Sequence, residues 1–215
     1  ENLKLAQAYA EDEKQQEVIG KLIEYYETGD LHTFDEYTIA WVENTAPMVD
    51  FVNGFTESYG DPLGMKASWE SIVNFKDTEA TKRTEKLSAN AQWFEDNSPV
   101  AAEFKKENVK GITAKVIKAA ILGGDLYPST AIGINLPNSN WVRAEHGSKS
   151  VTIANLTHAY AESSNGNGML DEFVYSQAEA DLIRQYGGVT DDLHTDLHEC
   201  LGHGSGKLLP GVDSE

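Results

Sequence analysis

The spacing of apolar residues divides the chain into helical and extended segments. Residues 1–28 carry apolar side chains at near-helical intervals, and residues 170–186 repeat this pattern near the other end. Shorter runs between them alternate apolar and polar residues, as strands with one buried face do. Helices are expected at 1–28, 33–43, 77–97, 97–107, 155–161, 170–186 and 190–203, and strands at 52–59, 66–75, 113–122, 132–136 and 150–154. Because helices and strands mix along the chain, the sequence predicts an α+β fold.

Turn and capping residues predict where several of these segments begin and end. Gly29-Asp30 is expected to end the first helix, and the capping box Thr33–Glu36 to open the next. Pro47 is expected to start a short turn or helix. Near the other end, Gly187-Gly188 is expected to end one helix, and Thr190 to cap the helix that follows.

Composition narrows the classes of function. The chain has 215 residues, a net charge of −18 and 17 basic residues, and no basic stripe is visible. Nucleic acid is therefore not an expected partner, because little positive charge is available to neutralise phosphates. The single cysteine excludes an intrachain disulfide. No apolar run reaches membrane-spanning length and no signal peptide is visible, so we expect no membrane partner and a cytoplasmic location.

The strongest chemical signal is the segment His198-Glu199-Cys200-Leu201-Gly202-His203. Two histidines that flank a glutamate are typical of zinc peptidases, in which the imidazoles hold the metal and the carboxylate moves a proton. The histidines stand at i and i+5 rather than at the usual i and i+4. At about 100° per residue, that spacing separates them by about 140° around a regular helix. We therefore expect a π-type bulge, which the backbone freedom of Gly202 permits.

Two other interpretations of this region are weaker. Gly204-Ser205-Gly206-Lys207 does not fit a phosphate-binding loop, because Leu208 stands where serine or threonine is needed and a helix precedes it. Cys200 is expected to be a buried helix residue, since its position on the helix points away from the two histidines. An incidental histidine pair remains the simplest non-functional interpretation of the motif.

The segment 198–207 resembles the zinc motif of the dipeptidyl peptidase III family, whose pattern is H-E-x-x-G-H. The cysteine in its third position resembles bacterial members. Glu57–Pro62 resembles the family's E-S-Y-x-D-P segment, and Trp69-Glu70 resembles its acidic substrate-binding strand. Gly133–Asn138 resembles its I-N-x-P-N segment. The matches run in the family's order from about residue 50 to residue 207, which makes them more specific than the zinc motif alone.

This resemblance implies a two-lobed enzyme with a wide cleft. A mostly helical lobe would hold one zinc ion, and a second lobe built around a β-barrel would hold the peptide. We expect residues 1–77 and 119–165 in the peptide-binding lobe, and residues 78–118 and 166–215 in the zinc lobe. The implied reaction is the zinc-dependent release of dipeptides from the N-termini of short peptides.

The resemblance also implies roles for individual residues. His198 and His203 resemble the zinc ligands, and Glu199 resembles the general base. Tyr59 resembles the tyrosine that supports the tetrahedral oxyanion. The residues that resemble substrate-binding groups are Glu57, Glu70, Asn135, Asn138 and Tyr160. From the pattern alone, the first two would be solvent-exposed strand residues, and the asparagines would belong to an ordinary turn.

The family's third zinc ligand is a glutamate in an E-E-x-x-x-D motif downstream of the histidine pair, beyond residue 215. We therefore expect this chain to be the central part of a longer protein, and to be inactive when isolated. The rival functions are a non-catalytic peptide- or metal-binding protein, or an inactive fragment that lacks the third ligand. Short peptides are the expected partners in the enzyme interpretation.

Overall fold

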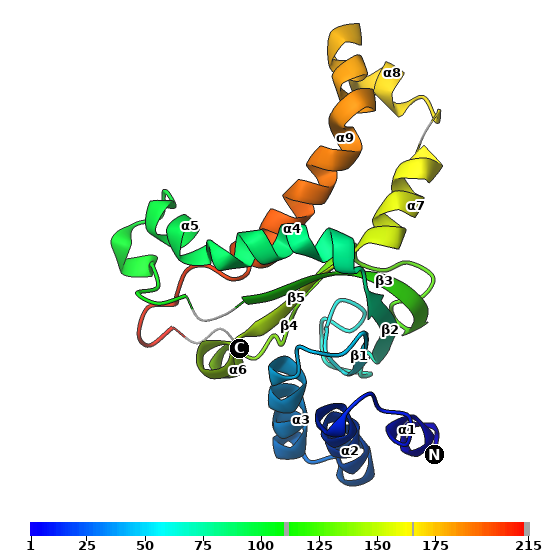
Figure 1. Ribbon diagram of the computed structural model, residues 1–215, viewed down its shortest axis with the longest axis vertical. Helices are drawn as coiled ribbons and strands as arrows, with labels where there is room; N and C mark the ends of the chain where they lie inside the picture. Colours follow the sequence, from blue (N-terminus) through cyan, green and yellow to red (C-terminus); the bar gives the residue numbers. More distant parts are fainter. Residues whose placement is uncertain (110–111, 165, 213–215) are drawn as a thin grey trace.

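Five strands from separate segments of the chain form one mixed sheet. The computed structural model describes residues 1–109, 112–164 and 166–212. The strands are β1 (Val49–Gly54), β2 (Glu70–Lys76), β3 (Ile112–Gly124), β4 (Gly133–Leu136) and β5 (Ser148–Ile153), in the order β1-β2-β3-β5-β4. The β3–β5 pair is parallel and the other pairs are antiparallel. In Figure 1 this sheet lies at the centre, with helices above and below it.

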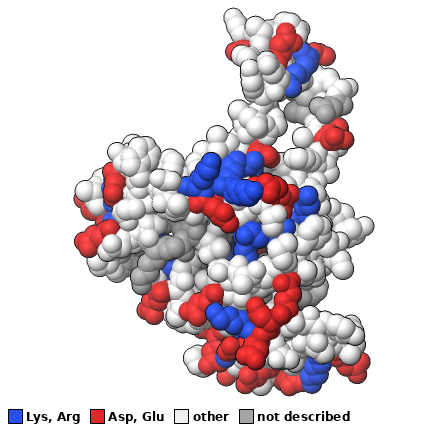
Figure 2. Space-filling model, viewed as in Figure 1, with Lys and Arg blue, Asp and Glu red and all other residues white. Residues whose placement is uncertain are grey.

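The first three helices cover one face of the sheet. They are α1 (Asn2–Gln7), α2 (Glu13–Thr28) and α3 (Leu31–Glu43). The apolar core lies between the last two of them and the strands, where burial removes side chains of every strand from water. Its buried members are Val18, Leu22, Tyr37, Trp41, Val42, Val52, Ile72, Ile117, Leu136 and Ile153. Figure 2 shows that acidic side chains gather over the outer side of this helical layer.

The other face of the sheet carries α4 (Thr78–Ala89) and the end of α9 (Gln177–Leu197). The remaining helices are α5 (Ala91–Asn97), η1 (Ala102–Phe104), α6 (Asn140–His146), α7 (Ala154–Ser164), α8 (Met169–Phe173) and the π-helix η2 (His198–Gly202). Helices α7, α8 and the first part of α9 form an arm that projects beyond the sheet (Figure 1). No helix in the described ranges is both long and apolar enough to cross a bilayer.

Strand β5 separates two chemical environments because successive side chains point to opposite faces of a sheet. Lys149 lies on the α3 side, with its ammonium 3.0 Å from Asp50 Oδ2 and 4.2 Å from the centroid of the Trp41 ring. Ser150 and Thr152 lie on the α9 side, where their hydroxyls bond to that helix and the turn after it. One strand thus anchors both helical layers.

The α+β class is confirmed, as are the strands near 113–122, 132–136 and 150–154 and the end of the predicted segment 66–75. The predicted helix 77–97 is present as α4 and α5, with a break at Asn90. The predicted boundary between residues 118 and 119 falls within β3, and the division of the chain into lobes stays a prediction.

The prediction of one helix over residues 1–28 is wrong. The chain breaks after α1, and Asp12 caps α2 by accepting a hydrogen bond from the Gln15 amide. The neighbouring Glu11 carboxylate accepts the amides of Met48 and Val49, so the break docks on the start of β1. Asp12 and Glu11 therefore do not belong to the polar face of one long helix. Asp12 caps α2, and Glu11 bonds to the start of β1.

Other helix boundaries also differ. Helix α3 is capped by Asp30, which accepts from the His32 amide, and Thr33 is buried within the helix. Gly187-Gly188 does not end a helix, because α9 continues to Leu197. Thr190 is not a cap, because its hydroxyl bonds to the Tyr186 and Gly187 carbonyls inside the helix.

The remaining errors concern short segments. The helix predicted at 97–107 is absent: α5 ends at Asn97, and only the single turn η1 follows it in this range. Pro47 lies in irregular chain rather than in a helix. The strand expected at 52–59 instead spans residues 49–54 and ends at Gly54, whose φ of 145° favours glycine. Helix α6 had no expected counterpart.

Candidate active site

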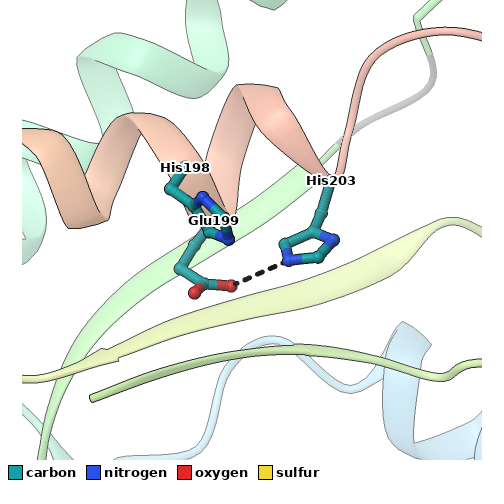
Figure 3. Close-up of side chains that lie close together, drawn as sticks. All are labelled: His198, Glu199 and His203. Atoms are coloured by element: carbon teal, nitrogen blue, oxygen red, sulfur yellow. Dashed lines mark ion pairs between the residues drawn. The ribbon is translucent and has the colours of Figure 1, made fainter. Parts of the chain in front are cut away.

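The two histidines of the motif meet because the helix that carries them widens. After α9 ends at Leu197, residues 198–202 form the π-helix η2. The His203 amide donates to the His198 carbonyl over 3.1 Å, which is the i to i+5 bond of a π turn. The expected bulge is therefore confirmed. The two imidazole centroids lie 4.8 Å apart with their planes at 85°. In Figure 3 the His203 ring points toward the Glu199 carboxylate.

Side chains from several elements fix this turn. Ser150 Oγ donates to the Glu199 carbonyl over 2.7 Å, and Arg143 Nη2 donates to the His203 carbonyl over 2.7 Å. One turn earlier, the fully buried Asp196 accepts from Thr152 Oγ1 over 2.8 Å and pairs with Arg83. A π turn is less regular than an α-helix, so these outside bonds hold its position on the sheet.

Glu199 occupies a buried space that Gly133 of β4 provides. A Cβ at position 133 would stand 2.7 Å from Glu199 Cδ and 2.8 Å from its Cγ, which a side chain cannot do. Glu199 is 6% exposed, and its Oε2 has no hydrogen-bond partner within the described ranges. Burial raises the pKa of this carboxyl from 4.5 to about 7. Burial, then His198 and then Arg143 lower the pKa of His203.

These three side chains form a cluster that could hold a metal ion. Their candidate ligand atoms all lie within 4.8 Å of one another. His203 Nε2 lies 4.0 Å from Glu199 Oε2. Both histidines are exposed to the cavity side, whereas the carboxylate is buried. Two imidazole nitrogens beside an unpartnered carboxylate fit a zinc-type donor set.

A cavity of about 780 Å³ opens beside this cluster. The predicted site residues that line it are Glu57, Tyr59, Glu70, Asn135, Asn138, His198, Glu199 and His203. Tyr160 is not among its lining residues, and the Tyr160 hydroxyl lies 3.4 Å from the carbonyl oxygen of Thr130, which does line it. The structure therefore brings eight of the nine predicted residues to one cavity.

Glu57 and Glu70 form an acidic wall of the cavity. Glu57 accepts a hydrogen bond from Asn138 Nδ2 over 2.9 Å, and Glu70 accepts one from the Thr56 hydroxyl. Burial raises the pKa of both carboxyls above their ordinary value. Glu70 is 3% exposed, whereas the Tyr59 side chain is 89% exposed. Such a wall favours a cationic group on any ligand that enters the cavity.

Several residues at the site had not been expected from the sequence. Gly133 makes room for Glu199, Thr56 bonds to Glu70, Arg143 bonds to the turn, and Ser150 anchors it. One signal was available for Ser150, since Ser150 and Thr152 place hydroxyls on one face of the predicted strand 150–154. The other three have no local sequence signal.

Cys200 is buried within the turn, as expected. Its side chain is 1% exposed, and burial raises the pKa of its thiol to about 12. A thiol in this state is a poor nucleophile and a poor metal ligand.

Comparison with known proteins gives this site its context. The sequence matches the model of Peptidase family M49 over residues 1–214. The chain belongs to peptidase family M49. Among curated proteins, this M49 chain is 29% identical to Dipeptidyl peptidase 3 of Rattus norvegicus and 30% identical to that of Homo sapiens, each over 210 residues. Each alignment covers 97% of this chain and 27% of the relative, so the chain spans about a quarter of their length.

Solved structures of the family share the fold. The structure of DPP III from Caldithrix abyssi superposes with a TM-score of 0.77 at 24% sequence identity, covering 94% of this chain and 38% of that one. The structure of dipeptidyl-peptidase III from Corallococcus sp. strain EGB gives a TM-score of 0.77 at 23% identity. This M49 chain therefore has the fold of the corresponding part of those proteins.

Proposed function

We propose that this chain forms the catalytic core of a zinc-dependent exopeptidase that releases dipeptides from the N-termini of short peptides. The observation that supports this most strongly is the single cavity shared by the metal-type cluster and the acidic wall. Family membership supports peptidase chemistry, and the M49 family implies a metal cofactor.

His198 and His203 are the proposed protein ligands of the zinc ion. Zinc would act as a Lewis acid and lower the pKa of a water molecule held there. A catalytic zinc site usually has three protein ligands, and the described cluster offers two imidazoles and the Glu199 carboxylate. Since Glu199 is proposed as the base, the third ligand should come from another carboxylate in a family-length protein, meaning one that contains this chain and the rest of the family's length.

Glu199 is the proposed general base and acid. Its carboxylate accepts a proton as water attacks the scissile carbonyl, and then delivers that proton to the departing amine. A base works best when its pKa lies near the working pH, and burial moves this carboxyl in that direction. The nearby metal charge would lower this pKa in the loaded enzyme. Tyr59 is proposed to donate a hydrogen bond to the oxyanion that develops on the attacked carbonyl.

The acidic wall is proposed to set the length of the product. Glu57 and Glu70 would receive the N-terminal ammonium of the peptide, with Asn138 beside them to bond its first residues. Because this wall lies at a fixed distance from the metal cluster, it places the second peptide bond at Glu199. A substrate without a free ammonium would lose its partner and leave buried carboxylates uncompensated.

A pair of peptides that differ only at the N-terminus tests this function. The family-length protein, loaded with zinc, should release a dipeptide from a short peptide with a free amine. Acetylation of that amine should lower kcat/KM about 100-fold or more, and a chelator should abolish release until zinc is added back. Equal turnover of the two peptides would exclude ammonium recognition by the acidic wall, and turnover in the presence of the chelator would exclude the metal.

A second candidate function applies to the chain by itself. With two imidazoles and no further carboxylate beside Glu199 in the described cluster, isolated residues 1–215 should bind zinc weakly and release no dipeptide. The same cavity would then act as a peptide-binding surface. Zinc-dependent release of dipeptide by the isolated chain would overturn this expectation.

A further inference from the structure

One face of β5 carries a row of hydroxyls that meets the end of α9. Ser148, Ser150 and Thr152 alternate along the strand and therefore share a face. Thr152 bonds to the side chain of Asp196, and Ser150 bonds to the main chain of Glu199. All three are buried, so these bonds form away from water. The row is the surface on which the π turn rests, and Figure 3 shows Glu199 pointing from the turn toward the strands beneath it.

Asn135 of β4 lies directly opposite Ser150 in the sheet register. Its Nδ2 donates to Ser150 Oγ over 2.6 Å and to Ser148 Oγ over 3.2 Å. The available hydrogen-bond donors determine the orientation of the Asn135 side-chain amide. A serine hydroxyl has one hydrogen, and that of Ser150 is used by the Glu199 carbonyl, so the group that Asn135 presents to Ser150 must be a donor.

The amide nitrogen of Asn135 is therefore used in hydrogen bonds within the protein. Asn135 is 7% exposed, and its Oδ1 is buried without a partner within the described ranges. By contrast, Asn138 is exposed and bonds to Glu57 on the acidic wall. The two asparagines of the motif thus stand in different positions. Asn138 is exposed beside Glu57, whereas Asn135 connects the cavity lining to Ser150 and through it to Glu199.

We propose that Ser150 is a positioning residue for Glu199, and that Asn135 orients the Ser150 hydroxyl through its amide nitrogen. The chain Asn135 Nδ2, Ser150 Oγ, Glu199 carbonyl fixes the main chain at the base, and Gly133 leaves the space into which its carboxylate extends. Catalysis depends steeply on such placement, since a shift of about 1 Å costs about 100-fold in rate. The expected loss of turnover rests on the proposed function, whereas the anchoring of the π turn by Ser150 does not.

Ser150→Ala removes the hydroxyl, and Ser148→Ala is its matched control. Both serines are buried on the same strand and bond to the same amide, but the described residues show no bond from Ser148 to the turn. In the family-length protein, Ser150→Ala should lower kcat about tenfold or more with KM within about twofold of the parent. Ser148→Ala should leave both constants within about twofold. Ser150→Thr restores a hydroxyl and should recover kcat to within about threefold.

Hydrogen exchange supplies a readout that does not need turnover. The His203 amide closes the π turn by bonding to the His198 carbonyl. In the isolated chain, Ser150→Ala should speed exchange of this amide about fivefold or more, whereas Ser148→Ala should not change it. Zinc affinity of the family-length protein should fall about tenfold in Ser150→Ala, as it does when residues that orient metal ligands are removed.

The outcomes separate this inference from the proposed function. If the wild-type protein releases no dipeptide, the proposed function fails, while faster exchange in Ser150→Ala alone still supports the anchoring of the turn. Equal exchange in both serine variants, or a change of KM alone, overturns the inference. If Ser150→Ala does not fold, Ser150→Cys decides: faster exchange of the His203 amide than in Ser148→Cys supports the inference, and equal exchange in the two variants overturns it.

Discussion

Two buried glutamates of this chain stand in opposite chemical situations. Glu95 of α5 is 1% exposed. Its carboxylate accepts hydrogen bonds from the Lys106 amide over 2.6 Å and from the Gly206 amide, in the loop after the motif, over 3.1 and 3.0 Å. Glu199, in the motif itself, is 6% exposed and has an oxygen without any partner in the described structure. Because both carboxylates are buried, burial alone does not explain this difference.

Glu95 is a structural carboxylate, whereas Glu199 is available for chemistry. The main-chain donors around Glu95 compensate its burial, so it ties two segments together. Those segments include Gly204-Ser205-Gly206-Lys207, which explains this glycine-rich stretch without a phosphate ligand. Glu199 lacks such compensation, and burial raises its pKa to about 7. A buried group left unsatisfied at a cost in stability is typical of functional sites.

Truncation of Glu95 should have the largest effect on stability. Glu95→Ala leaves the Lys106 and Gly206 amides without their acceptor, and each unsatisfied buried donor costs about 1–3 kcal/mol. We expect the free energy of unfolding to fall by about 3 kcal/mol or more in urea denaturation. Asp96→Ala, at the exposed neighbouring position, should change it by less than about 0.5 kcal/mol. A loss below about 1 kcal/mol in Glu95→Ala would contradict its assignment as a structural clasp.

Neutralising Glu199 should instead raise the free energy of unfolding. Because the pKa of Glu199 is about 7 in the folded chain and 4.5 is its ordinary value, the folded state binds the proton more tightly than the unfolded state. Its contribution to stability is thus present below about pH 4.5 and is lost as the pH rises through 7. In the metal-free chain at pH 8, Glu199→Gln should therefore be more stable than wild type by about 1–3 kcal/mol, and the gain should disappear near pH 4.5. A gain that is independent of pH would contradict the raised pKa.

Gly133→Ala tests whether Glu199 needs the space that Gly133 leaves beside its side chain. In Gly133→Ala the new Cβ collides with the Glu199 side chain and displaces its carboxylate. Turnover by the family-length protein should fall about tenfold or more, at little change in KM. Gly188→Ala is the control, because a Cβ there meets no atom within 4 Å and alanine favours a helix. Turnover of Gly133→Ala equal to that of this control would show that Glu199 does not depend on the space at position 133.

The sequence predicted those features that depend on local pattern. The i, i+5 spacing of His198 and His203 required a π turn, and the structure has one. Alternation of side chains located β3, β4 and β5 to within a few residues. The resemblance of four short segments indicated which residues converge on the cavity, although their roles stay predictions. Such features need no knowledge of contacts between distant parts of the chain.

The errors arose where distant contacts decide the outcome. Gly187-Gly188 lies within α9, because the 21-residue helix continues past it to Asp196, whose side chain is held by Thr152 and Arg83. Asp12 caps a helix where the apolar spacing alone predicted continuity. The two asparagines of Asn135–Asn138 look equivalent in sequence, but only the register of β4 on β5 turns Asn135 toward Ser150. Gly133 is important because of Glu199, which is 66 residues away in sequence and in contact in space.

The role of Glu199 is tested most directly by the turnover of Glu199→Ala in the zinc-loaded, family-length protein, measured together with its zinc content. Zinc should stay bound by the histidines while the release of dipeptide falls about 100-fold or more, because the general base is lost. Turnover within about tenfold of wild type, at full zinc content, would contradict the role of Glu199 as the base.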